Sequence, residues 1–254
     1  MGTINAIVVI AAVLIGGALA AAGLGSKYEV WDYGTGLTIL RQLALPAMAL
    51  TGVASVLWIA NLIVRRRFSV PVFVATIIAA TVAAVPLKMK QLVDANPFIH
   101  DISTDFEDPP KIVVAAPLDR QNPAKYVGDE LVPRSNITVS QAQQDAFADI
   151  GPVWLDYSVD ESAEIIGSVV RSMGMEILHD GPISDGWRLE AADTSFWFGF
   201  VDDFIVRLRS DGVKTRIDVR SKSRVGGSDL GANANRVRRF YENLSTAIGE
   251  ELDR

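Results

Sequence analysis

Three apolar runs occupy most of the first 93 residues, and each is long enough to cross a lipid bilayer. They cover residues 4–24, 43–64 and 70–87. A membrane-spanning helix needs about 20 predominantly apolar residues, and no ionisable residue lies in the middle of any of the three runs. The sequence therefore predicts an N-terminal transmembrane anchor of three helices over residues 1–93.

A cleaved secretory signal peptide is the competing interpretation of the first run, because Ala-rich sequence follows its apolar core. However, no Lys or Arg precedes the run, and it is long for the apolar part of a signal peptide. We therefore expect a retained helix.

The orientation of the anchor follows from Arg65-Arg66-Arg67, a basic cluster between the second and third runs. Loops rich in Lys and Arg stay in the cytoplasm, so the N-terminus is expected there, and the loop 26–42 and all residues after Leu87 outside. Four basic residues then lie on the outer side and count against this orientation: Lys27, Arg41, Lys88 and Lys90.

Composition excludes several classes of function. The net charge of −6 argues against nucleic-acid binding, which needs a cationic surface. The chain has no cysteine, so disulfides, thiolate catalysis and Cys-ligated zinc are excluded. No charge interrupts the predicted spans, which leaves a transport or proton-relay role without ionisable groups to act through.

Residues 94–150 form a Pro- and Asp-rich segment with little periodicity, which predicts irregular chain docked on the soluble domain. A short helix is expected over residues 140–148, with Ser140 as its N-cap. Residues 151–254 are expected to form an ordered core. Ser158 and Glu161 have capping-box spacing before a helical apolar pattern that ends at Gly174.

Strands are expected near residues 153–157, 175–179 and 187–191, with a turn at 180–182, followed by a long hairpin that turns at Asp211-Gly212. A last amphipathic helix is expected from about residue 229. This order predicts an α+β domain in which two helices pack on one face of an antiparallel sheet.

The hairpin carries charged side chains at informative positions. Asp202 lies on the same row as Phe204, so it is expected on the apolar face, whereas Asp203 points to the other face. On the return strand, alternation places Ile217 and Val219 inward. The residues expected to face outward are Lys214, Arg216, Asp218 and Arg220. A carboxylate on an apolar row needs a hydrogen-bonding or charged partner.

Several polar motifs together resemble the DUF1499 family. They are Val201-Asp202-Asp203, the stretch 218–226 (DVRSKSRVG), the stretch 228–233 (SDLGAN) and the stretch 96–105 (NPFIHDISTD), which is followed by Pro109-Pro110. The resemblance covers about residues 96–244. It implies a domain of unknown function from bacteria or plastids, often placed behind a membrane anchor or export signal. It favours a bacterial inner membrane protein with the soluble domain on the periplasmic side.

Three roles are open for these polar residues. They could pair internally, with Asp202 and Asp203 bound to Arg220 and Arg224, and with Ser228 or Asp229 capping the last helix. They could bind an anion such as a lipid head group, or support assembly with another membrane protein. They could also form a hydrolase-type or metal-dependent site on His100, Asp101 and Ser103 with the Asp202/Asp203 pair.

We favour a binding or assembly module and expect no metal or cofactor. The bilayer is the one partner that the sequence itself predicts. The candidate ligand-binding residues are His100, Asp101, Ser103, Asp105, Asp202, Asp203, Arg220, Arg224, Gly226, Gly227, Ser228, Asp229 and Asn233.

Overall fold

A computed structural model describes residues 2–249 and 252. The chain forms two compact units. The first holds the residues up to Leu92 together with Ser195–Gly199, and the second holds Val93–Thr194 and the chain from Phe200 onward.

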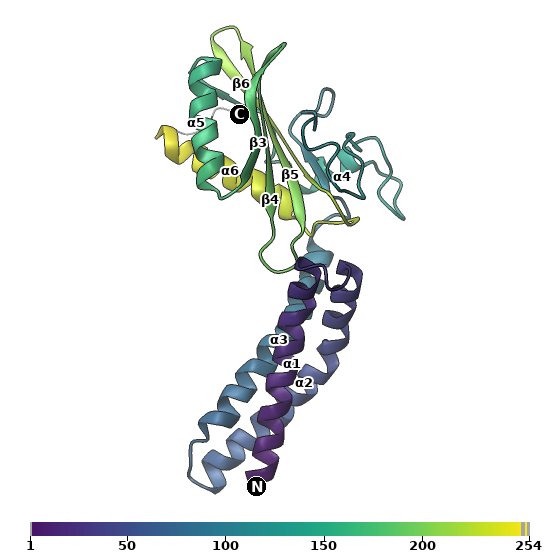
Figure 1. Cartoon of the computed structure of the whole chain (residues 1–254), viewed down its shortest axis with the longest axis vertical. Coiled ribbons are helices and arrows are strands. Elements are labelled where there is room, and N and C mark those ends of the chain that lie inside the picture. The colour runs from purple at the N-terminus through teal and green to yellow at the C-terminus, as the bar shows by residue number, and fades with distance from the viewer. Residues whose placement is uncertain (1, 250–251, 253–254) are drawn as a thin grey trace. The chain divides into compact units, whose positions relative to one another are not determined.

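The first unit is built from three long helices, α1 (Gly2–Lys27), α2 (Tyr33–Val64) and α3 (Val70–Ala95), as Figure 1 shows. All three are long and apolar enough to cross a membrane. The expected loop over 26–42 is wrong, because α2 already begins at Tyr33. Asp32 caps that helix by accepting hydrogen bonds from the backbone N–H and hydroxyl of Thr35.

Small residues lie where the three helices pack together. Ala12 of α1, Ala54 of α2 and Ala75 of α3 meet in one buried cluster. At Gly36 a side chain would collide with the carbonyl of Ala22, so glycine is required where α1 and α2 come together. Close approach through small residues is the usual means by which membrane helices associate.

The segment Ser195–Gly199, which links strands β4 (Gly186–Thr194) and β5 (Val201–Asp211), belongs to this helical unit. The indole Nε1 of Trp197 donates to the carbonyl of Ala20 at 3.2 Å, and Lys27 Nζ donates to the carbonyl of Phe196 at 3.1 Å. The alternating apolar row of Phe196, Phe198, Phe200 and Phe204 predicts a long strand that begins at Phe196. This is wrong, because β5 begins only at Val201.

The second unit contains a six-stranded antiparallel sheet in the order β1-β6-β5-β4-β3, with β2 also paired to β6. Two helices, α5 and α6, cover one face of this sheet (Figure 1). The prediction of an α+β fold with two helices on one face is therefore confirmed. The elements are β1 (Asp101–Ser103), α4 (Val139–Ala146), β2 (Val153–Leu155), α5 (Val159–Ser172), β3 (Glu176–Ile183), β4 (Gly186–Thr194), β5 (Val201–Asp211), β6 (Lys214–Ser223) and α6 (Ala232–Ile248).

The core between the sheet and the helices follows the predicted alternation. Phe204, Val206 and Leu208 of β5 and Ile217 and Val219 of β6 are all buried in it. The capping box of Ser158 and Glu161 is present at the start of α5. Gly174 has φ of 79°, as expected after a helix C-terminus.

Three local predictions are wrong. The turn between β3 and β4 lies at residues 184–185 and not at 180–182, because Ile183 pairs with Gly186. The N-cap of α4 is Thr138 instead of Ser140, since the Thr138 side chain accepts from the N–H of Gln141. The last helix begins at Ala232, three residues later than expected.

The second face of the sheet is lined by charge. Alternate residues from Arg216 onward point to it, and we call these five side chains the ionic row: Arg216, Asp218, Arg220 and Lys222 of β6, and Arg224, which follows the strand. The sequence placed the first three of them outward. They do face away from the helices, but Asp218 and Arg220 are only 0% and 2% exposed, because residues 104–126 fold over them.

Candidate functional site

Asp101 of β1 is the centre of a buried ion cluster. The Nε and Nη2 atoms of Arg220 donate to its two oxygens at 2.8 and 2.9 Å, and Lys222 Nζ donates to Oδ2 at 2.9 Å. Such a bidentate, charge-assisted pair is among the stronger hydrogen-bonded arrangements in proteins. The three side chains are almost fully shielded from solvent. They form the Asp101 triad.

The same triad ties the irregular segment to the sheet. Arg220 also donates to the carbonyls of Pro110 and Ala124, and Lys222 donates to the carbonyl of Lys125. These hydrogen bonds join residues 110, 124 and 125 to β6, although they lie about 100 residues apart in the sequence. The triad consequently has a structural role whatever else it does.

The titration behaviour of the triad reflects its charge balance. Burial opposes ionisation of Asp101, but Arg220 and Lys222 outweigh it and hold the pKa of this carboxyl below its usual value. Burial lowers the pKa of Lys222, with Asp101 acting in the opposite direction. Two cations thus share one carboxylate, and the triad carries a net charge of about +1 when all three groups are ionised.

A second triad is centred on Asp203 of β5. Arg224 Nε donates to Asp203 Oδ1 at 2.8 Å, and Arg120 Nη1 lies 3.0 Å from Oδ2. The predicted pairing of Asp203 with Arg224 is therefore confirmed. Again two guanidinium groups share one carboxylate, so this cluster also has a surplus positive charge.

Asp202 does not pair with Arg220 as the sequence suggested. It faces α6 and accepts from Arg236 Nη2 at 2.6 Å, while Asp193 accepts from Arg236 Nε at 2.8 Å. Asn233, also on α6, donates to the carbonyl of His100 and to the hydroxyl of Ser223. The predicted pairing with Arg220 and Arg224 is therefore wrong for Asp202, because successive side chains of a strand point to opposite faces.

Asp105 belongs to a third cluster. Its Oδ2 lies within 3.2 Å of the guanidinium groups of Arg207, Arg209 and Arg216, and Asp218 accepts from the same three arginines. Asp108 also accepts from Arg207 and Arg209. Three cations meet three carboxylates here, so this cluster is balanced.

Asp229 lies two residues before Gly231, the N-cap of α6. Its carboxylate accepts from the backbone N–H groups of Gly231 and Asn233 at 2.8 and 2.9 Å. Burial raises the pKa of Asp229, with these two hydrogen bonds acting against the rise. An internal carboxylate therefore already uses the amides that an external anion would need.

The glycine turn before α6 is closed by other contacts. The space beside Gly227 is filled by the ring of Phe98, and the side chain of Asn122 donates to the carbonyl of Gly226. The hydroxyl of Ser228 accepts from the N–H of Leu230.

The residues of the enzyme hypothesis do not combine into one site. His100 Nδ1 lies 3.3 Å from the carbonyl of Gly227, and the hydroxyl of Ser103 donates to the carbonyl of Asp105. Asp101 is fully engaged by the triad described above. Within residues 2–249 and 252, no group of three or more His, Asp or Glu side chains is arranged to hold a metal ion.

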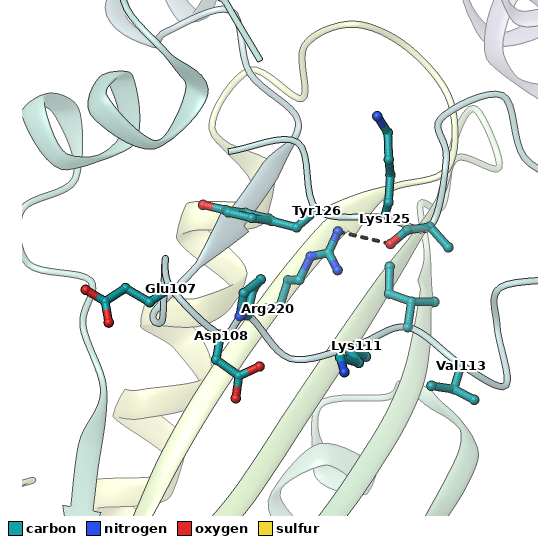
Figure 2. A pocket seen from close by; sticks show the side chains of 10 residues that line it. Glu107, Asp108, Lys111, Val113, Lys125, Tyr126 and Arg220 are labelled. Carbon is teal, nitrogen blue, oxygen red and sulfur yellow. Dashed lines mark hydrogen bonds between the residues drawn. The ribbon is translucent and has the colours of Figure 1, made fainter. Parts of the chain in front are cut away.

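A cavity of about 460 Å³ opens beside the Asp101 triad and is shown in Figure 2. Arg220 forms part of its wall, and the ring of Tyr126 stacks on the guanidinium at 5.3 Å. Lys111 and Lys125 also line it, although Lys125 pairs with Glu130 and extends away from Arg220 in Figure 2. Two acidic residues, Glu107 and Asp108, complete its polar lining.

Several important residues have no clear signal in the sequence. Glu190 of β4 is 1% exposed and accepts from the backbone N–H groups of Val113, Val114 and Ala115. Arg120 and Arg236 complete ion clusters from distant positions. A carboxylate within a largely apolar strand is the only sign of Glu190 in the sequence, and it does not identify the backbone groups that Glu190 binds.

Comparison with protein families gives one match. The model of a family described as "Protein of unknown function (DUF1499)" matches residues 101–244, which include β1, the ionic row and most of α6. No curated protein matches the chain.

Proposed function

Because this chain belongs to the DUF1499 family of proteins of unknown function, we propose a role for it that rests on the cavity beside Arg220. The chain is a membrane-anchored binding module, and this cavity receives a negatively charged phosphate or carboxylate group of its ligand. The three apolar helices hold the module at a bacterial inner membrane with residues 94–254 on the periplasmic side.

The observation that carries the proposal is the surplus of positive charge at the wall of an open cavity. Arg220 has five N–H groups, and four of them donate to Asp101, Pro110 and Ala124. One N–H of Nη1 is left for a ligand. An anion bound there would balance the two cations that share Asp101, and a partly enclosed site strengthens that attraction.

Direct titration of the full-length protein in detergent micelles with inorganic phosphate, and separately with acetate, tests the proposal by calorimetry. We expect saturable binding that Lys111→Gln weakens about 3- to 10-fold, in line with the loss of one charge contact. Ala124→Leu narrows the cavity and is expected to weaken binding further. Lys214→Gln, which removes a partly exposed lysine that lies outside the cavity and pairs with Asp156, is the matched control.

Absence of saturable binding for both anions would contradict the proposal. So would equal effects of Lys111→Gln and Lys214→Gln. The orientation is tested separately by a C-terminal alkaline phosphatase fusion, which is active in the periplasm and inactive in the cytoplasm.

A further inference from the structure

A second cavity lies entirely within the helical unit, between the beginning of α2 and the end of α3. Its volume is about 480 Å³. Its apolar lining comes from Leu37 and Leu40 of α2 and from Pro86 and Met89 of α3. Two basic residues, Arg41 and Lys90, also line it, one from each helix, and no acidic residue does.

Arg41 is the informative member of this set. It is exposed, and it forms no hydrogen bond or ion pair with any residue in 2–249 or at 252. On a helix that crosses a bilayer, a cation without a protein partner needs either water or a lipid phosphate. Its position beside an apolar groove therefore distinguishes it from a basic residue on an ordinary water-exposed surface.

The position along the helices fits the head-group level of a membrane. The apolar run of α2 begins two residues after Arg41, and the run of α3 ends three residues before Lys90. From Arg41 to the end of α2 at Val64 the helix extends about 35 Å at 1.5 Å per residue. The hydrocarbon core is about 30 Å thick, so Arg41 lies close to one boundary whichever way the chain is oriented.

We propose that this groove binds one anionic phospholipid. Its phosphate lies against Arg41 and Lys90, and the first methylenes of an acyl chain pack on Leu40, Pro86 and Met89. The same arrangement gives a reason for basic residues at the end of the bundle opposite Arg65, Arg66 and Arg67. This site is independent of the cavity beside Arg220.

Native mass spectrometry of the full-length protein tests the inference after reconstitution with phosphatidylglycerol or with phosphatidylcholine. We expect phosphatidylglycerol to be retained preferentially, and Arg41→Gln to reduce its retention at least threefold. The matched control is Arg65→Gln, which removes an arginine from the other end of α2. Thr38→Trp fills the groove without changing any charge and is expected to reduce retention as well.

Two results would overturn the inference. One is equal loss of lipid in Arg41→Gln and Arg65→Gln, which indicates nonspecific attraction to the bilayer. The other is equal retention of the two lipids by the unaltered protein. Lys111→Gln is expected to leave retention unchanged, so failure of this site and failure of the cavity beside Arg220 give different results. Circular dichroism confirms that each variant keeps its helices.

Discussion

The two faces of the sheet are covered in different ways. The face under α5 and α6 is packed with apolar side chains from both strands and helices. The opposite face carries the ionic row, and it is covered by residues 104–126, which form irregular chain held by ion pairs and side chain–backbone hydrogen bonds. A helix satisfies its own backbone groups and mainly buries apolar surface. An irregular segment that covers a sheet needs a specific hydrogen-bond partner for each backbone N–H and C=O group that it buries.

The difference has an energetic consequence. Removing one partner of a buried ion cluster leaves an uncompensated charge and is strongly destabilising. Replacing the whole cluster by apolar residues of similar volume costs much less. The charged face should therefore be sensitive to single substitutions, to acid and to loss of individual hydrogen bonds. The helical face should respond mainly to the volume removed and to the capping of its helices.

The largest effect is expected for Asp101→Ala, because it leaves Arg220 and Lys222 buried without their carboxylate. The free energy of unfolding should fall by about 3–5 kcal/mol. Pulse proteolysis of the full-length protein in detergent measures it. Replacing the whole triad by Asp101→Leu, Arg220→Met and Lys222→Met should recover most of the loss. A loss below about 1 kcal/mol for the single variant would contradict the proposed sensitivity of this face.

The next largest effect is expected for the pH dependence of stability, which should come from the charged face and not from the helical face. The folded-state pKa values of Asp101 and Asp105 are lowered, so unfolded chains take up protons first as the pH falls. Their stabilisation is complete above the ordinary carboxyl pKa of about 4 and is lost as the pH falls through the folded-state values. Stability of the second unit should therefore decline below about pH 4, and Asp101→Asn should flatten this decline. A pH-independent stability between about 2 and 5 would show that these carboxylates are not paired.

Glu190→Gln tests the hydrogen bonds that hold the backbone of residues 113–115 against the charged face. The substitution leaves three buried N–H groups with a weaker acceptor, and a loss of about 1–3 kcal/mol is expected. Hydrogen exchange should accelerate at Val113, Val114 and Ala115 while α5 remains protected. Glu164→Gln, on the exposed side of α5, is the control and should change neither quantity.

Ser158→Ala is the corresponding test on the helical face. It removes the capping box of α5, which is expected to cost about 1 kcal/mol. Ser158→Asp should retain stability because Asp is an equally good N-cap. If Ser158→Ala leaves the free energy of unfolding unchanged, packing alone stabilises the start of α5.

The smallest effect is expected for Asp229→Asn. Burial raises the pKa of this carboxyl and so disfavours its ionised form. One carboxylate oxygen accepts from Gly231 and the other from Asn233, so an asparagine side chain keeps only one of these two hydrogen bonds. Because removal of the buried charge offsets part of this loss, the change in unfolding free energy should stay below about 1 kcal/mol. A loss above about 2 kcal/mol would show that the charge itself holds the N-terminus of α6.

The helical face could be predicted from the sequence because its signals are local. Apolar alternation in β5 and β6 and the box at Ser158 and Glu161 each lie within a few residues. The signals of the three long apolar helices are equally local, since length and apolarity define them. Their ends were less well predicted, because Tyr33 and Thr35 start α2 through the cap at Asp32 and not through hydrophobicity.

The charged face could be predicted only in part, because its partners are distant in the chain. Alternation showed that Arg220 and Asp218 share a face, but it could not distinguish solvent from a cover of irregular chain. Asp203 and Arg224 were paired correctly because Asp203 lies on β5 and Arg224 directly follows the neighbouring strand β6. Arg120 and Glu190 were missed, since no periodic pattern connects them to the groups that they bind.

The assignment of Ser195–Gly199 to the helical unit has a practical consequence for dissecting the protein. The polypeptide passes from one unit to the other at three places: after Leu92, after Thr194 and after Gly199. A fragment that starts at residue 93 keeps Trp197 but loses Ala20, Ser26 and Lys27, whose contacts hold this link in place. Such a fragment would expose indole and phenyl rings to water, and its self-association would be an artefact of the cut.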